Sequence, residues 1–141
     1  MNRCATPSKS SRQRWIALAI ASAAAVAALV PLSAEARRFP INALRGRIVF
    51  TSPPDIELNG DPARLSPGVR IHNFNNMMIM TGAVAGSDRK YVVDYTVEST
   101  GLVSEVWLLT TDEADVSPWP RNTTEAGKWT FDYMAQTWTK P

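Results

Sequence analysis

Apolar and polar residues alternate in short runs between Gly46 and Thr110, and turn-forming residues separate these runs. Alternation with a period of two is typical of strands that bury one face. The predicted strands are 47–51, 55–58, 69–74, 77–80, 91–98 and 102–110. Because no long helical pattern separates them, we expect an all-β fold: a small antiparallel barrel or sandwich, OB-like or SH3-like.

Turn residues predict where these strands end. Asn59-Gly60 is a strong signal for a two-residue hairpin turn, and Asn75-Asn76 tolerates the left-handed conformation that such turns require. Residues 61–65 are expected to form one helical turn, because an aspartate followed by a proline is typical of a helix start. We expect further turns at 66–68 and 86–88.

The alternation also predicts which side chains share a face. In the strand 91–98, one face carries Tyr91, Val93, Tyr95 and Val97, and the other face is mostly polar. In the strand 102–110, one face carries Val103, Trp107 and Leu109. We expect the aromatic and aliphatic faces to line the core.

Three methionines, Met77, Met78 and Met80, lie in one predicted strand with Ile79. Alternation places apolar side chains on both faces of this strand, which suits a strand buried on both sides. The alternative is an adaptable binding face, a role to which flexible thioether side chains are suited. We favour core packing.

The N-terminal segment has the three-part pattern of a secretory signal peptide. A basic segment, 1–15, precedes the uncharged run 16–30, and Ala34 and Ala36 provide the small residues of an A-x-A cleavage site. We expect cleavage after Ala36 and a periplasmic or secreted, bacterial location. The alternative is an uncleaved anchor, although the run 16–30 is shorter than the roughly 20 apolar residues that a spanning helix needs.

Processing would change the charge balance of the chain. Of 15 Lys and Arg residues four precede residue 37, and of 13 Asp and Glu residues one does, which leaves 11 positive and 12 negative groups. A basic stripe is the usual footprint of nucleic-acid binding, and we therefore expect no nucleic-acid partner. The one cysteine, Cys4, also precedes residue 37, so the mature chain has no disulfide and no thiolate-bound zinc.

The predicted organisation is a signal peptide at 1–36, a linker at 37–45, a small β domain at 46–111 and a tryptophan-rich tail at 112–141. The acidic start of the tail is expected to form a short helical turn.

Three runs of this chain resemble a family of small exported bacterial proteins. They are LRGRIVFTSPPDIELNG at 44–60, RLSPGVRI at 64–71 and VWLLT at 106–110. The resemblance covers residues 44–111 and implies residence in the cell envelope and a compact β domain. It implies no catalytic residue, because no chemistry is assigned to that family.

His72 is the only histidine and the one candidate for a general base. A base needs a nucleophile or an orienting acid, and no recognisable partner set accompanies it. Asp55, Glu57 and Asp61 cluster near a turn but lack the spacing of an EF-hand, so we interpret them as a solvated turn. We expect no metal and no cofactor.

Trp119, Trp129 and Trp138 lie in a tail with little regular structure to bury them. Exposed aromatic side chains mark binding surfaces. The three are therefore candidates for partner contact, and the alternative is that the tail wraps the barrel and seals it.

We expect a non-catalytic envelope module that binds a protein or envelope partner, with no stable membrane insertion after cleavage. The alternatives are a small periplasmic hydrolase that uses His72 with an aspartate, and a membrane-tethered component if residues 16–30 are never removed.

Overall fold

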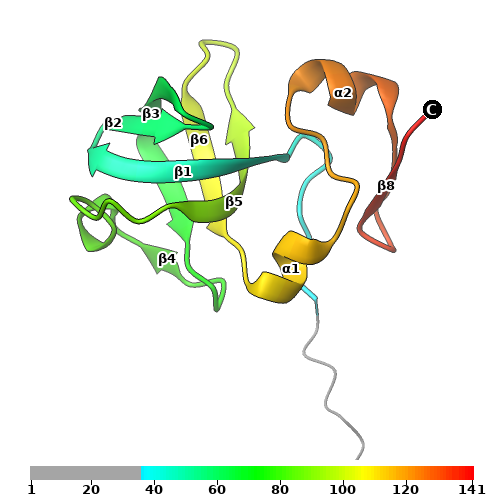
Figure 1. The fold of residues 1–141 in the computed structure, drawn as a ribbon, viewed down its shortest axis with the longest axis horizontal. Helices are drawn as coiled ribbons and strands as arrows, with labels where there is room; N and C mark the ends of the chain where they lie inside the picture. Colours follow the sequence, from blue (N-terminus) through cyan, green and yellow to red (C-terminus); the bar gives the residue numbers. More distant parts are fainter. Residues whose placement is uncertain (1–35) are drawn as a thin grey trace, which may run out of the picture. The chain divides into compact units, whose positions relative to one another are not determined.

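Five strands close into a barrel in the computed structural model, which describes residues 36–141 (Figure 1). The strands are β1 (Leu44–Ser52), β2 (Asp55–Leu58), β3 (Asp61–His72), β5 (Tyr91–Val97) and β6 (Val103–Leu108). β1 pairs with β2 and β5, β3 pairs with β2 and β6, and the pair β5–β6 completes the ring. The prediction of a small all-β barrel is confirmed.

One pair in the ring, β3 with β6, is parallel, whereas the other pairs are antiparallel. A barrel in which the third and last strands are parallel neighbours has the Greek-key order of an OB-like barrel rather than a simple up-and-down meander. Alternation predicts faces but not strand direction, and for that reason the sequence did not reveal this pair.

The turn at Asn59-Gly60 is the predicted hairpin turn. These two residues have φ values of 57° and 95°, and a type I′ turn requires a positive φ at both central positions. Leu58 and Asp61 face each other across the turn. The chain therefore returns directly along β2, and the predicted helical turn at 61–65 is wrong because hairpin pairing overrides the capping signal.

β3 bends, and the bend allows it to serve two neighbours. Its first part, 61–64, pairs with β2, Leu65 and 70–72 pair with β6, and 71–72 also pair with β4. Between them the register with β6 shifts, and Gly68 has a φ of 83°, which glycine reaches without steric cost. The turn expected at 66–68 is a bend within one strand.

The interior of the barrel holds the main core. Val93 and Tyr95 are buried there, with Tyr91 and Val97 packed against them, so the predicted inner face of the strand 91–98 is confirmed. The other buried members are Leu44, Ile48, Phe50, Ile56, Leu65, Ile71, Val84, Val103, Val106 and Leu108.

A bulge in β6 reverses the expected alternation. Val97 faces Val103 and Thr96 faces Glu105, which leaves Ser104 as an extra residue. An extra residue inverts the faces on its two sides. Val103 consequently joins the barrel core while Trp107 points outward, and the prediction that these two share a face is wrong.

The hairpin at 75–76 is present, with the loop 73–77 in place of the expected two-residue turn, but its methionines are not in the core. β4 (Met78–Ile79) pairs with the end of β3, and Asn76 has a φ of 59°. Met78 and Met80 are 67% and 85% exposed. Core packing of these side chains is therefore wrong, because β4 is a two-residue strand at the edge of the sheet, where no element of residues 36–141 covers it.

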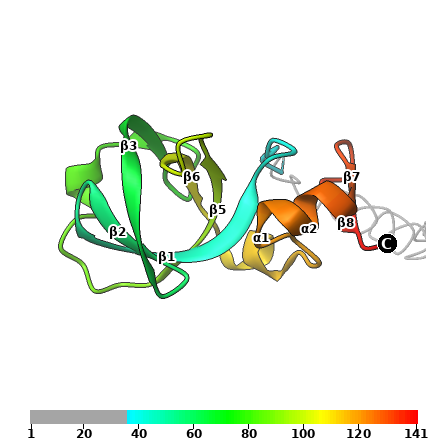
Figure 2. The same ribbon diagram turned by 90° about the horizontal axis from the view of Figure 1, so that it is seen from above.

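The C-terminal part of the chain lies beside the barrel (Figure 2). After η2 (Thr81–Ala83) and the last barrel strands come α1 (Thr111–Asp115), α2 (Thr123–Lys128), β7 (Thr130–Asp132) and β8 (Thr137–Thr139). Thr110 and Glu113 form a capping box that starts α1, which confirms the predicted helical turn. β7 and β8 form a separate antiparallel pair. No helix within residues 36–141 is long and apolar enough to cross a membrane.

A second core joins these elements to the outer face of β6. Its buried members are Phe39, Ala43, Trp107, Leu109, Trp119 and Trp138. Residues 37–45, for which we expected a linker, take part in this packing, and β1 already begins at Leu44. The packed unit spans residues 37–141, and the expected signal segment with Ala34 lies outside the described residues.

We expect Gly46→Ala to destabilise the barrel. A β-carbon at position 46 would lie 2.8 Å from Oδ1 of Asn59 and 2.9 Å from a ring carbon of Tyr95. Overpacking of this kind costs about 1–3 kcal/mol, which thermal melting detects. Gly82→Ala is the control, because a β-carbon there meets no atom within 4 Å. Equal melting temperatures for the two variants would contradict the close approach at Gly46.

Candidate functional site

A row of side chains crosses the outer face of the sheet. Strand register places Arg45 opposite Asp94, Asp94 opposite Trp107, Trp107 beside His72, and His72 opposite Met78. Directly opposed residues point to the same face of a sheet. The C-terminal elements cover the middle of this row, which is why Asp94 and Trp107 are buried although they lie outside the barrel.

Arg45 and Asp94 form a buried ion pair. Nε of Arg45 lies 2.9 Å from Oδ1 of Asp94, and Nη2 lies 3.2 Å from Oδ2, so the contact is bidentate. Asp94 is fully buried and the arginine side chain is 12% exposed. Burial raises the pKa of Asp94 to about 6, although the hydrogen bonds and charge of Arg45 act in the opposite direction.

Arg45 also fastens the C-terminal segment to the barrel. Its guanidinium donates to the carbonyl oxygens of Ala114 and Val116 and lies 4.6 Å from the ring centre of Trp119. Its backbone N–H donates to the carbonyl of Pro120 at 2.8 Å. Removal of this one side chain would leave a buried carboxylate and two carbonyl groups without their donor.

A second arginine, Arg37, holds the start of the described chain. It donates to both carboxylate oxygens of Glu113 and to the backbone carbonyls of Asn73 and Leu108. Burial would raise the pKa of Glu113, but the bonds from Arg37 and Thr110 outweigh it and lower that pKa below its ordinary value. Residue 37, the expected first residue of the mature chain, is thus an anchored part of the domain.

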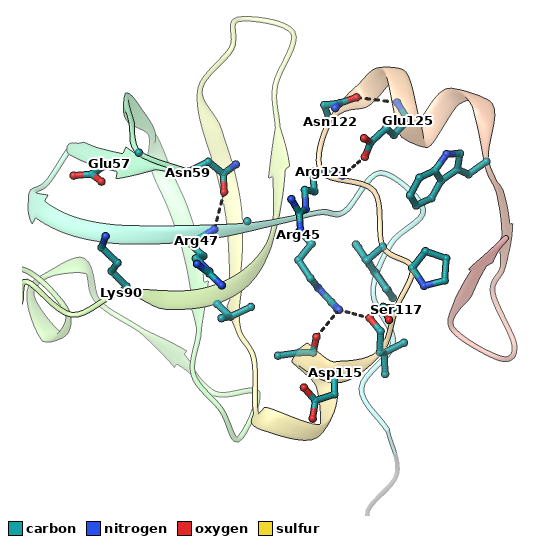
Figure 3. Close-up of a pocket in the computed structure, with 18 of the residues that line it drawn as sticks. Arg45, Arg47, Glu57, Asn59, Lys90, Asp115, Ser117, Arg121, Asn122 and Glu125 are labelled. Atoms are coloured by element: carbon teal, nitrogen blue, oxygen red, sulfur yellow. Dashed lines mark hydrogen bonds between the residues drawn. The ribbon is translucent and has the colours of Figure 1, made fainter. Parts of the chain in front are cut away.

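Between the barrel and this segment lies an open groove of about 1140 Å³ (Figure 3). Figure 3 shows Arg47 and Lys90 on its barrel side and Asp115 and Arg121 on its C-terminal side. Its apolar lining comes from Val49, Val92, Val116, Pro118, Trp119 and Trp129. Arg45 also lines the groove.

The groove is more basic than the domain that carries it. Its lining has five cationic residues and three acidic ones, whereas residues 37–141 carry 11 cationic and 12 acidic groups. Within residues 36–141, Arg47, Lys90 and Arg121 form no ion pair, and neither do the acidic lining residues Glu57, Asp115 and Glu125, so the groove keeps a small excess of positive charge. Charges in a partly enclosed cleft attract opposite charge more strongly than the same charges on a flat surface.

The candidate tryptophans divide between core and groove. Trp119 and Trp138 are 6% and 3% exposed and belong to the second core, where they pack against other aromatic side chains. Trp129 is half-buried, lines the groove and has the ammonium of Lys140 at 5.1 Å from its ring centre. Trp119 and Trp129 both line the groove, and Trp129 is the more exposed of the two.

His72 has an acidic partner, but the partner is Glu105 rather than an aspartate. Nε2 lies 2.9 Å from Oε1 of Glu105, and Arg70 donates to the other carboxylate oxygen at 3.0 Å. The imidazole is stacked on Trp107 with ring centres 5.5 Å apart. No serine or threonine hydroxyl of residues 36–141 forms a hydrogen bond with His72, so the described part of the chain shows no nucleophile–base pair.

Two of the three acidic residues near the first hairpin are solvated, as expected, whereas Glu57 is half-buried and lines the groove. Asp55 and Asp61 are exposed, and Asp55 forms an exposed ion pair of 3.5 Å with Arg64. Within the described range, no group of three His, Cys, Asp or Glu side chains is arranged to hold a metal ion.

Comparison of the chain with protein-family models, with curated proteins and with solved structures gave no match. Function therefore has to be inferred from the sites themselves.

Proposed function

We propose that this protein is an exported, non-catalytic barrel module of the cell envelope that binds a partner protein in the groove. The observation that carries the proposal is the groove itself, with Arg47, Lys90 and Arg121 directed into it and free of ion pairs within the described residues. Side chains that keep their charge unpaired in a concave, partly apolar site are suited to bind a ligand of opposite charge.

The lining favours a peptide that carries both acidic and apolar side chains. Arginine and lysine bind carboxylates through charge-assisted hydrogen bonds. Val92, Val116 and Trp129 provide apolar surface next to these cations. A purely anionic ligand would leave that surface unused, so an acidic segment of a partner protein suits the groove best.

The hydrolase alternative is less well supported. His72 is held between Glu105 and Trp107, and it is not among the residues that line the groove.

The tethered alternative differs only in the fate of residues 16–30. Intact mass of the exported protein distinguishes it, because cleavage after Ala36 leaves a chain that begins at Arg37.

The proposal is tested by capture of partners from the envelope with the wild-type protein and the double variant Arg47→Glu/Lys90→Glu. We expect the variant to lose the captured protein, because two attractive charges of the groove become repulsive. Arg64→Glu is the matched control, since Arg64 is exposed and lies outside the groove.

Capture that is equally strong with all three proteins would show that the groove is not the binding site. Equal loss with Arg64→Glu would show that only general charge matters. Circular dichroism of each variant separates loss of binding from loss of fold.

A further inference from the structure

We propose that His72, Met78 and Met80 form a binding site for a soft monovalent metal ion, Cu(I) or its analogue Ag(I). These residues share no member with the groove, so the two proposals stand independently. Thioether sulfur and imidazole nitrogen are ligands that favour Cu(I), and cysteine and carboxylate clusters are not needed for it.

The backbone places the three side chains on one face. His72 and Met78 are directly opposite in the β3–β4 ladder. Ile71 and Ile79 form the adjacent pair of the same ladder. Ile71 is buried in the barrel core, so His72 points outward, and Met78 points with it.

Met80 continues this face. Its backbone is extended, with φ −77° and ψ 151°, so its side chain points to the same side as that of Met78 two residues earlier. Diagonal neighbours across a ladder lie roughly 7–8 Å apart, which long side chains can span. Methionine has three rotatable side-chain bonds, and both sulfurs can therefore approach one point beside the imidazole.

His72 is already held as a metal-binding histidine usually is. Such a histidine donates its other ring N–H to a carboxylate, which fixes the ring orientation and leaves one nitrogen free for the ion. Here Nε2 is 2.9 Å from Glu105, and Glu105 is held in turn by Arg70. Nδ1 is buried and has no hydrogen-bond partner within the described structure.

That orphan nitrogen needs an explanation, because a buried polar atom without a partner costs free energy. With the proton on Nε2, Nδ1 carries a lone pair that no donor of residues 36–141 meets. A bound cation would satisfy it. The exposure of Met78 and Met80, 67% and 85%, leaves their sulfurs free to complete the ligand set.

The test is a titration of the Cys4→Ser variant of the full chain with Ag(I), which needs no reductant, because the thiol of Cys4 would itself bind a soft metal ion. Binding is followed by NMR of the methionine methyl groups and by the change in tryptophan fluorescence, to which Trp107, on which His72 stacks, contributes. We expect saturation at one ion per chain, with shifts at Met78 and Met80. Met78→Leu and Met80→Leu should each weaken binding by on the order of tenfold or more.

Met134 provides a matched control, because it is 78% exposed and lies in the C-terminal segment. Met134→Leu should leave Ag(I) affinity unchanged, and Glu105→Gln should lower it by about 10–100-fold through loss of the carboxylate that orients His72. Shifts at Met134 as large as those at Met78, or affinity that Glu105→Gln leaves unchanged, would overturn the proposal. Arg47→Glu tests the groove separately and should not affect Ag(I) binding.

Discussion

Truncation after Val116 is expected to lower the melting temperature by about 10 °C or more. Trp119 and Trp138 are almost fully buried in the second core, and the truncation removes both of them. Burial of one large aromatic side chain contributes about 1.5–3 kcal/mol. The deletion would also expose Trp107, which packs in the same cluster. Differential scanning calorimetry of the truncated and the untruncated protein measures the difference in melting temperature.

Trp138→Ala extends this test to a chain that keeps its length. It should cost about 3–5 kcal/mol, as is typical of large-to-small changes in a core. Met134→Ala, at a side chain that is 78% exposed, should have almost no effect. If the truncated chain melts like the full domain, the C-terminal segment is not part of the folded unit and the second core has no energetic role.

Arg45→Met is expected to destabilise the protein by about 3–5 kcal/mol at neutral pH, because loss of one partner of a buried ion pair leaves an uncompensated charge. Asp94 is fully buried, and the methionine side chain would retain the apolar contacts of the arginine stem. Urea unfolding at pH 7 measures the loss. Arg64→Met is the control, since that pair is 62% and 70% exposed and should be worth less than about 1 kcal/mol.

The same pair predicts a dependence on pH. Asp94 has a folded-state pKa of about 6, above its ordinary value of 3.8, so its contribution to stability is complete below about pH 4 and is lost as the pH rises through 6. Glu113 acts in the opposite sense, because its pKa is lowered and its contribution is lost as the pH falls. Between pH 5 and 7 the free energy of unfolding should therefore fall as the pH rises, as the titration of Asp94 requires.

In Arg45→Met the pKa of Asp94 should rise further, since the arginine lowers it in the wild-type protein. The variant should therefore recover part of its lost stability when the pH is lowered from 7 to 5. A loss that is the same at both pH values would show that the carboxylate is not the source of the destabilisation.

Strand positions and turns were predictable from the sequence because they depend on local signals. Asn59-Gly60 and the alternation in 91–98 gave a hairpin and an inner face that the structure confirms. The parallel β3–β6 pair and the bulge at Ser104 were not predictable, since both depend on which distant strand becomes a neighbour.

The groove was not predictable for a related reason. Arg45 and Asp94 are 49 residues apart in sequence, and neither stands in a motif. Asp94 occupies the polar face of its strand, and only the position of the C-terminal segment shows that this face is buried. For the methionines of the strand 77–80 the prediction was burial and the structure shows exposure. Apolar composition predicts burial only where another element covers the strand.

The most direct test of the binding groove is an NMR titration of isotope-labelled protein with a random copolymer of glutamate and tyrosine. We expect saturable amide shifts at Arg47, Lys90, Arg121 and Trp129, which line the groove. They should weaken as salt is raised toward 1 M, where the screening length falls to about 3 Å. A lysine and tyrosine copolymer should produce no such shifts. Shifts that are absent, or that are centred on Arg64 and Arg70 outside the groove, would contradict the account.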